Sequence, residues 1–234
     1  MALARTIVEH VEEVWALPDH GIWERRGPRK HYVFSKVMTW VAIDRAIKGA
    51  ERFGYDAPLD RWRGLRQTIH RDVCERGFDV DQETFVESYD SRLLDASVLL
   101  LPSVGFLPAS DPRIRGTLAA VERHLMRDGF VLRHDPREVS NEQQPIEGAF
   151  LACTLWLADA YVLTGELDKA QALFDRVVAV ANDLGLLAEE FDSAARRQTG
   201  NFPQALTHIA LINTAHNVSD AKKASEKPVM QRSK

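Results

Sequence analysis

The sequence has little cysteine and no long apolar run. Cys74 and Cys153 are its only cysteines among 234 residues, too few and too widely spaced for a cluster of metal ligands. They fit a reducing compartment, and we expect a cytoplasmic protein with two buried thiols. Charged residues such as Asp44 and Arg45 interrupt each apolar stretch well before the ~20 residues that a bilayer-spanning helix needs. We therefore expect no membrane partner.

The charge pattern and the absent motifs exclude further classes of function. The net charge is −4, and basic residues are scattered among acidic ones, so no stripe is available for a phosphate backbone and we expect no nucleic-acid partner. The eight histidines include no His-Glu-x-x-His pair. The sequence also has no Gly-x-Ser-x-Gly elbow, no dinucleotide-binding glycine motif and no phosphate-binding loop. We expect no metal and no cofactor.

What the sequence does contain is helical periodicity. Its hydrophobic content of 45% suffices for a sizeable core. Apolar residues recur at helical spacing, which predicts an all-α fold with helices at residues 3–16, 35–53, 59–76, 92–104, 112–127, 147–164, 167–183 and 203–217. We expect Ser35 and Asp111 to cap two helix starts, and Gly54, Gly77 and Gly165 to end three helices.

Two segments break the helical pattern. Residues favouring β-structure at 78–80 and 84–86 flank a polar turn, which predicts a small β-hairpin inserted in the helical scaffold. From residue 218 to residue 234 the apolar periodicity stops and lysines accumulate, which predicts a disordered polar tail.

Residues 157–178 resemble a tetratricopeptide hairpin, with Tyr161, Gly165, Ala170 and Phe174 at the expected offsets. The pattern does not recur about 34 residues away on either side, and a lone hairpin of this kind does not bury its own faces. An ordinary pair of helices is the simpler interpretation. A helical interaction scaffold is the alternative.

Two turns that bear carboxylates each precede a strongly apolar helical stretch. The first is Gly-Ile-Trp-Glu at residues 21–24, and the second is Leu-Ala-Glu-Glu-Phe-Asp at residues 187–192. Hydrolysis of a glycosidic bond needs one carboxylic acid to protonate the leaving oxygen and a second carboxylate to activate water or attack the sugar carbon. The turns supply both groups if the fold brings them together. Taken alone, Glu24 is also explained as a solvated acid beside Arg25 and Arg26.

Four pieces of sequence carry a family resemblance. In order they are Gly-Ile-Trp-Glu with Ser-Lys-Val-Met-Thr-Trp at residues 21–40; Glu-Ser-Tyr, Leu-Asp-Ala-Ser and Leu-Leu-Leu-Pro at 87–102; Glu-Gly-Ala-Phe-Leu at 147–151; and the Glu-Glu pair with Gly-Asn-Phe-Pro-Gln-Ala at 187–208. Together they resemble glycoside hydrolase family 15, the family of glucoamylases and bacterial trehalases. The resemblance spans roughly residues 1–217 and implies an (α/α)6 toroid, present here in incomplete form, with its substrate pocket in loops at one end.

The resemblance implies roles for individual residues. The Trp-Glu turn would carry the general acid, Glu24, and the first glutamate of the later pair would be the general base, Glu189, with Glu190 as the alternative base. The mechanism would be inversion, with water entering between carboxyl groups ~6.5 to 9.5 Å apart. The expected substrate is a carbohydrate, either an α-glucan oligosaccharide or trehalose. The residues expected to bind it are Trp23, Arg26, His31, Lys36, Asp95 and Glu147.

Structural interpretations compete with several of these roles. In the competing interpretation, three of these residues hold the Glu24 loop or face solvent: Arg26, His31 and Lys36. Asp95 and Glu147 each place a favourable negative charge near the start of a predicted helix.

The resemblance also implies that this chain corresponds to the C-terminal part of such an enzyme. Full-length bacterial members begin with a β-sandwich domain and further barrel helices, so we expect a missing N-terminal segment or a second copy to cover the open barrel. The competing class of function is a non-catalytic helical module, either the repeat-like scaffold or a degenerate hydrolase that binds sugar without cleaving it.

Overall fold

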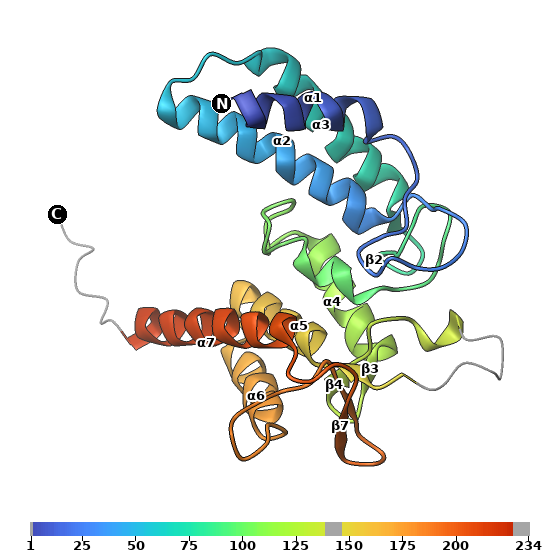
Figure 1. The fold of residues 1–234 in the computed structure, drawn as a ribbon, viewed down its shortest axis with the longest axis vertical. Helices are drawn as coiled ribbons and strands as arrows, with labels where there is room; N and C mark the ends of the chain where they lie inside the picture. Colours follow the sequence, from blue (N-terminus) through green and yellow to red (C-terminus); the bar gives the residue numbers. More distant parts are fainter. Residues whose placement is uncertain (1, 139–146, 227–234) are drawn as a thin grey trace. The chain divides into compact units, whose positions relative to one another are not determined.

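The computed structural model of the protein describes residues 2–138 and 147–226, and most of these residues are helical (Figure 1). The chain divides into two compact units, Met1–Thr117 and Leu118–Lys234. Among the described residues, no helix has both the length and the apolar character needed to cross a bilayer.

The first unit is built on the helices α1 (Ala2–Val14), α2 (Val33–Phe53) and α3 (Leu59–Arg76). Helices α2 and α3 lie side by side, and α1 packs on α2 (Figure 1). The core between them is apolar and fully buried, and it includes Val37, Ile43, Trp62, Ile69 and Val73. Gly54 ends α2 in the left-handed conformation, with φ 65°, and its N–H donates to the carbonyl of Ala50 as a helix C-cap does.

The predicted hairpin is confirmed as strands β1 (Phe78–Asp79) and β2 (Thr84–Phe85), which pair antiparallel. The predicted helix at 92–104 is wrong, because this segment contains only the short 3₁₀ helix η1 (Ala96–Leu100). Pro102 follows η1 closely, and its ring nitrogen has no N–H to donate to a helix carbonyl. Helix α4 (Pro112–His124) comes next. Its predicted cap is confirmed, since Asp111 accepts a hydrogen bond from the N–H of Arg113 at 2.9 Å.

The second unit combines helices with short antiparallel sheets. Strands β3 (Met126–Arg127) and β4 (Phe130–Val131) form a hairpin, and the 3₁₀ helix η2 (Pro136–Glu138) follows. A three-stranded sheet has the order β5 (Ala149–Phe150), β6 (Glu190–Asp192), β7 (Arg197–Thr199). Helix α5 (Leu151–Thr164) packs against α6 (Leu167–Val178) and α7 (Ala205–Glu226). Every residue of α5 from 151 to 158 is buried, as its all-round apolar sequence requires.

Several helix boundaries differ from the sequence predictions; α6, for example, ends at Val178 rather than at residue 183. Helix α2 begins at Val33, so Ser35 is not its cap; the Ser35 hydroxyl instead donates to Asp19 at 2.9 Å. Helix α5 begins at Leu151 rather than at residue 147, because residues 149 and 150 pair with β6. Helix α7 continues to Glu226, so residues 218–226 are helical rather than disordered, and the rest of the predicted tail lies outside the described residues.

The two cysteines have different environments. Cys153 is buried, as predicted, whereas Cys74 is half-buried. Burial raises the pKa of the Cys74 thiol. A thiol with a raised pKa is a poor nucleophile at neutral pH, so a structural role suits it better than a chemical one.

Candidate active site

The Trp-Glu turn lies in the loop between α1 and α2. The N–H of Glu24 donates to the carbonyl of Gly21 at 3.3 Å, which closes a tight turn. Both residues have left-handed backbone conformations, with φ 70° at Gly21 and 48° at Glu24. Such a conformation is uncommon for a residue other than glycine, and strained residues cluster at functional sites. The Glu24 side chain is exposed, so the turn presents a carboxyl group to solvent.

Trp23 connects this turn to η1. Its indole Nε1–H donates to Oδ2 of Asp95 at 2.8 Å. The other oxygen of Asp95, Oδ1, accepts from the N–H of Ser97 at 2.8 Å and caps η1. Asp95 is 3% exposed, so both of its oxygens serve the protein in this structure. The predicted helix-start role of Asp95 is therefore seen, together with a contact to the turn.

Lys36 lies in the first turn of α2 and is 1% exposed. Its Nζ donates to the backbone carbonyls of Trp15 and Leu17, in the loop that leads into the turn. Burial lowers the pKa of Lys36, and the nearby carboxylates of Asp19 and Asp72 oppose that shift. The side chain therefore holds the loop, which was the structural alternative to sugar binding.

His31 packs on Tyr89 of the Glu-Ser-Tyr motif, with 5.8 Å between their ring centroids. The Tyr89 hydroxyl donates to Asp72 at 2.8 Å. Burial lowers the pKa of His31, and the charges of Lys36 and Arg76 add to that shift. A neutral imidazole follows at neutral pH. Arg26, by contrast, is exposed.

Glu87, whose position behind the turn the sequence analysis missed, has a fully buried side chain. Its Oε1 lies 3.0 Å from Nζ of Lys30 and 3.7 Å from Nη1 of Arg25, and its carbonyl accepts from the N–H of Val33 at the start of α2. Buried carboxylates need such cationic partners. An acidic residue directly after the apolar pair Phe-Val was the available signal.

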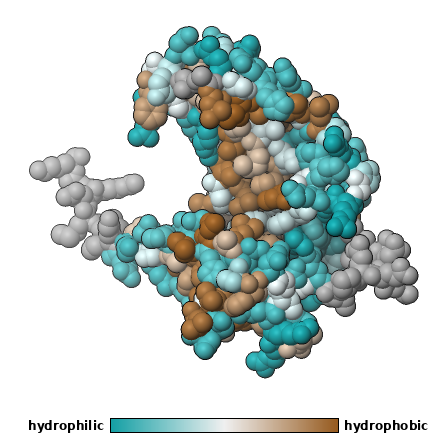
Figure 2. All heavy atoms as spheres, viewed as in Figure 1, coloured by the Kyte–Doolittle hydropathy of each residue, from teal (hydrophilic) through white to brown (hydrophobic). Residues whose placement is uncertain are grey.

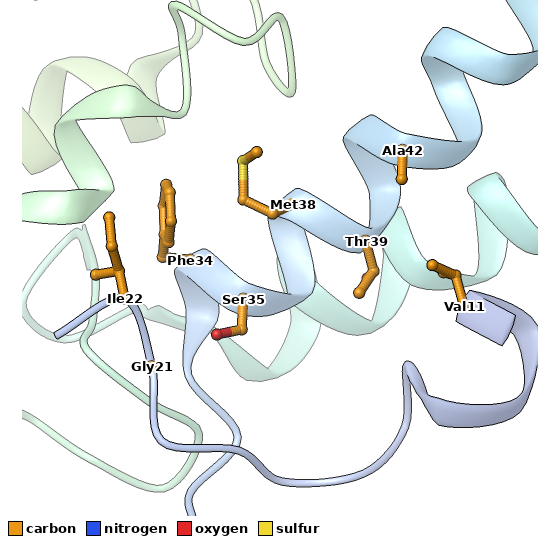
Figure 3. Close-up of a pocket in the computed structure, with 8 residues that line it drawn as sticks. All are labelled: Val11, Gly21, Ile22, Phe34, Ser35, Met38, Thr39 and Ala42. Carbon is orange, nitrogen blue, oxygen red and sulfur yellow. The ribbon is translucent and has the colours of Figure 1, made fainter. Parts of the chain in front are cut away.

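An apolar groove of about 370 Å³ adjoins the turn (Figure 3). It is lined by Val11, Gly21, Ile22, Phe34, Ser35, Met38, Thr39 and Ala42. Its two hydroxyl groups are engaged, since Ser35 donates to Asp19 and Thr39 donates to the carbonyl of Lys36. The groove therefore offers apolar contact rather than acid–base chemistry.

Glu189 lies in the second unit, directly before β6. Its Oε2 accepts from the backbone N–H of Asn201 at 3.1 Å and from Nδ2 of the same residue at 2.9 Å. Its own N–H donates to the Asn201 carbonyl, and its carbonyl accepts from the N–H of Leu151. Gly200 fits closely against this side chain, because a Cβ there would lie 2.9 Å from the Cβ of Glu189. Asn201 and Gly200 thus explain the Gly-Asn motif as the support of Glu189.

The side chain of Glu190 has different partners. Its Oε2 accepts from the N–H of Gly148 at 3.1 Å, and its Oε1 lies 3.8 Å from Nη2 of Arg133. Arg133 also forms an ion pair with Glu147. The expectation that Glu147 starts a helix is wrong, because β5 separates it from α5. Arg133 was missed by the sequence analysis, since nothing local distinguishes it from a surface arginine.

Glu190→Gln is expected to gain stability relative to the native protein as pH rises from about 4 to about 8. Burial raises the pKa of Glu190 above its ordinary value, while the Gly148 N–H and Arg133 oppose the shift. Between the two pKa values the folded state binds more protons than the unfolded state, so native stability falls as pH rises, and glutamine escapes this loss. Melting temperatures of both proteins across this pH range measure the difference.

Asp79→Asn is the control, because the pKa of Asp79 is shifted in the opposite direction to that of Glu190. Hydrogen bonds from Gln82 and the charge of Arg92 outweigh burial and lower the pKa of Asp79. The contribution of this group to native stability is therefore lost only as pH falls below the ordinary aspartate pKa of about 3.9, so from pH 4 to 8 the asparagine variant should show no trend relative to the native protein. Parallel trends in the two variants would contradict the assignment of the Glu190 environment.

The structure groups the predicted residues within each unit. Five of them belong to the first unit, where every side chain except that of Glu24 has the contacts given above: Glu24, Trp23, Lys36, His31 and Asp95. Glu147, Glu189 and Glu190 belong to the second unit. The pairing of Glu24 with Glu189 across a substrate stays a prediction.

Comparisons with known proteins bear on both units. The sequence profile described as "Glycosyl hydrolases family 15" matches residues 2–216. A trehalase of Mycobacterium tuberculosis is 42% identical over 94% of this chain and 32% of its own length, and one of Thermoplasma volcanium is 39% identical over 92% and 34%. The chain spans about a third of the length of these relatives.

A solved structure shows the same fold. The glucoamylase from Saccharomycopsis fibuligera superposes with a TM-score of 0.73 at 13% identity, covering 92% of this chain and 60% of that one. At this identity the likeness concerns the fold alone. The predicted class, an incomplete (α/α)6 toroid of the six-hairpin glycosidase type with a small β-hairpin, is confirmed.

Proposed function

This chain belongs to glycosyl hydrolases family 15, and we propose that it carries the acid and the base of an inverting trehalase-type glycosidase. One observation carries the proposal: each glutamate of the family motifs is held by its backbone while part of its carboxyl group stays available. Glu24 is exposed on a strained turn. Glu189 has Oε2 fixed by Asn201, and Oε1 accepts no hydrogen bond from the residues that the structure describes.

The proposed reaction is hydrolysis of the bond that joins two α-linked glucose units. Protonated Glu24 donates its proton to the bridging oxygen as the bond from C1 to that oxygen breaks. Oε1 of Glu189 removes a proton from a water molecule, whose oxygen bonds to C1 from the opposite face. One trehalose and one water give two glucose molecules, one of them as the β-anomer. The two glutamates then return to their starting protonation states by exchange with solvent.

Trehalose is the substrate that the relatives support, since those at 39–42% identity are trehalases. The full-length gene product should release glucose from trehalose at a higher kcat/KM than from maltotetraose. Proton NMR in the first minutes should show α- and β-glucose in equal amounts from trehalose. Release of the α-anomer alone would contradict inversion. Binding of trehalose without any release would favour the non-catalytic sugar-binding alternative.

Exposed apolar side chains support a covering partner. Leu3 and Ile7 of α1 are 74% and 48% exposed, and Leu206, Ile209 and Ile212, at intervals of three residues along α7, are 38%, 56% and 57% exposed. Figure 2 shows hydrophobic residues at the surface over α1 and α2. Soluble proteins rarely leave such faces open.

We propose that further helices of the full-length gene product cover these faces, because the chain spans only about a third of its relatives. Hydrogen exchange would show this as slower exchange in α1 and α7 of the full-length product than in the chain alone. Equal exchange in both would contradict it, and self-association of the chain alone would indicate a second copy instead.

A further inference from the structure

The conformation of the Trp-Glu turn depends on the contacts around it. Glu24 adopts a left-handed conformation and its side chain is exposed, so neither backbone preference nor side-chain burial fixes its place. A strained conformation persists only where surrounding contacts hold it. The contacts around this turn therefore decide where the Glu24 carboxyl group lies.

Contacts hold the turn before, within and after its centre. Before it, Oδ1 of Asp19 accepts from the N–H of Gly21 at 2.6 Å. After it, Arg25 pairs with buried Glu87 at 3.7 Å. Within it, the indole of Trp23 donates to Asp95. Trp23 and Arg25 both adjoin Glu24, and of their two contacts the indole hydrogen bond is the shorter, at 2.8 Å against 3.7 Å.

We infer that Asp95 is a positioning residue that fixes the proposed acid, Glu24, through the indole of Trp23. This inference rests on the proposed function. Asp95 is almost fully buried, and its carboxylate accepts hydrogen bonds from the Trp23 indole and from the N–H of Ser97, each at 2.8 Å. Hydrogen bonds to a charged acceptor are the strong ones, and two of them anchor the turn to η1. Asp95 acts on the protein rather than on the sugar.

Loss of the Asp95 contact should impair one step of the reaction, the protonation of the leaving oxygen by Glu24. A general acid must lie within hydrogen-bond reach of the oxygen that it protonates, so a displaced turn weakens acid assistance. Trehalose needs that assistance because its leaving group is a sugar alkoxide. α-Glucosyl fluoride does not, because fluoride departs without a proton. Attack by water, which Glu189 assists, is required for both substrates.

The test compares these two substrates in the full-length gene product with Asp95→Asn, Trp23→Phe and the double variant. The single amide oxygen of asparagine accepts from only one of the two donors. We expect kcat for trehalose to fall on the order of 10- to 100-fold in Asp95→Asn, with KM little changed and α-glucosyl fluoride hydrolysis within about threefold of native. The double variant should be no slower on trehalose than the slower single variant, because both remove one contact.

Asp111→Asn is the matched control. Asp111 caps α4 through the same kind of hydrogen bond, in which its Oδ1 accepts from the N–H two residues later, but none of its described hydrogen bonds comes from an indole. This variant should leave the ratio of the two activities unchanged. Equal losses on both substrates in Asp95→Asn, or none on either, would overturn the inference.

A second readout does not depend on turnover. Arg26 and Arg29 are exposed in the loop after Glu24, so trypsin reports how firmly the loop is held. Cleavage there should be several-fold faster in Asp95→Asn than in the native protein or in Asp111→Asn, and unchanged cleavage would overturn the inference. A native protein that hydrolyses neither substrate refutes the proposed function, while the trypsin comparison still decides whether Asp95 holds the turn.

Discussion

Glu24→Gln and Glu189→Gln should each slow trehalose hydrolysis by about 10²- to 10⁴-fold with little change in melting temperature. Glutamine keeps the shape of the side chain but neither donates nor accepts the catalytic proton. At position 189 its amide oxygen still accepts the two hydrogen bonds from Asn201, and at position 24 the side chain is exposed. The loss should fall on kcat, because the proton moves only in the transition state. Steady-state kinetics and thermal melting of the full-length gene product measure both effects.

The two variants should differ on α-glucosyl fluoride. Glu24→Gln should keep most of this activity, whereas Glu189→Gln should lose it, since water must still be deprotonated. Glu190→Gln is the control for the base, because Glu190 is adjacent in sequence but binds Gly148 and Arg133. We expect it to stay within about tenfold of native. Equal inactivity of Glu189→Gln and Glu190→Gln would contradict the choice of Glu189 as the base. Near-normal trehalose hydrolysis by Glu24→Gln would refute the assignment of Glu24 as the acid.

Helices that bury one face were predictable from the sequence. Helix α3 has the predicted bounds, and α2 differs only in starting two residues earlier. The segment at 92–104 was not predictable in this way, because a buried apolar run looks the same in a helix and in an irregular segment. Strand β5 was missed because its partner β6 lies about 40 residues away. The continuation of α7 through residues 221–226 follows from alanine, lysine and glutamate, which favour helices even where no apolar stripe is present.

The candidate site was likewise only partly predictable from the sequence. Motif order was enough to propose Glu24 and Glu189 as the acid and the base, but the partners that hold them are set by tertiary contacts. Asp95 and Trp23 are 72 positions apart, so no local pattern links them. Lys36 is a cation in a helical sequence and resembles a solvated residue until its burial is known.

Gly200→Ala should lower turnover by about 10²-fold on trehalose and on α-glucosyl fluoride alike. A Cβ at this position would lie 2.9 Å from the Cβ of Glu189 and 3.0 Å from its Oε2, so the proposed base has to move. A displacement of about 1 Å at a catalytic group costs on the order of 100-fold in rate. Because water attack is common to both substrates, this loss should not discriminate between them, unlike the loss expected from Asp95→Asn.

Gly185→Ala separates this displacement from backbone strain. Gly185 and Gly200 have nearly the same left-handed conformation, with φ 75° and 77°, so alanine should destabilise both sites by about 1 to 2 kcal/mol. Apart from its chain neighbours, no heavy atom of the described residues lies within 4 Å of a Cβ added at Gly185, so its alanine variant should keep native kinetics while melting at a lower temperature. If both variants lost activity to the same extent, strain alone would explain the result. If only Gly200→Ala loses activity, the close fit of this glycine is what places the carboxylate of Glu189.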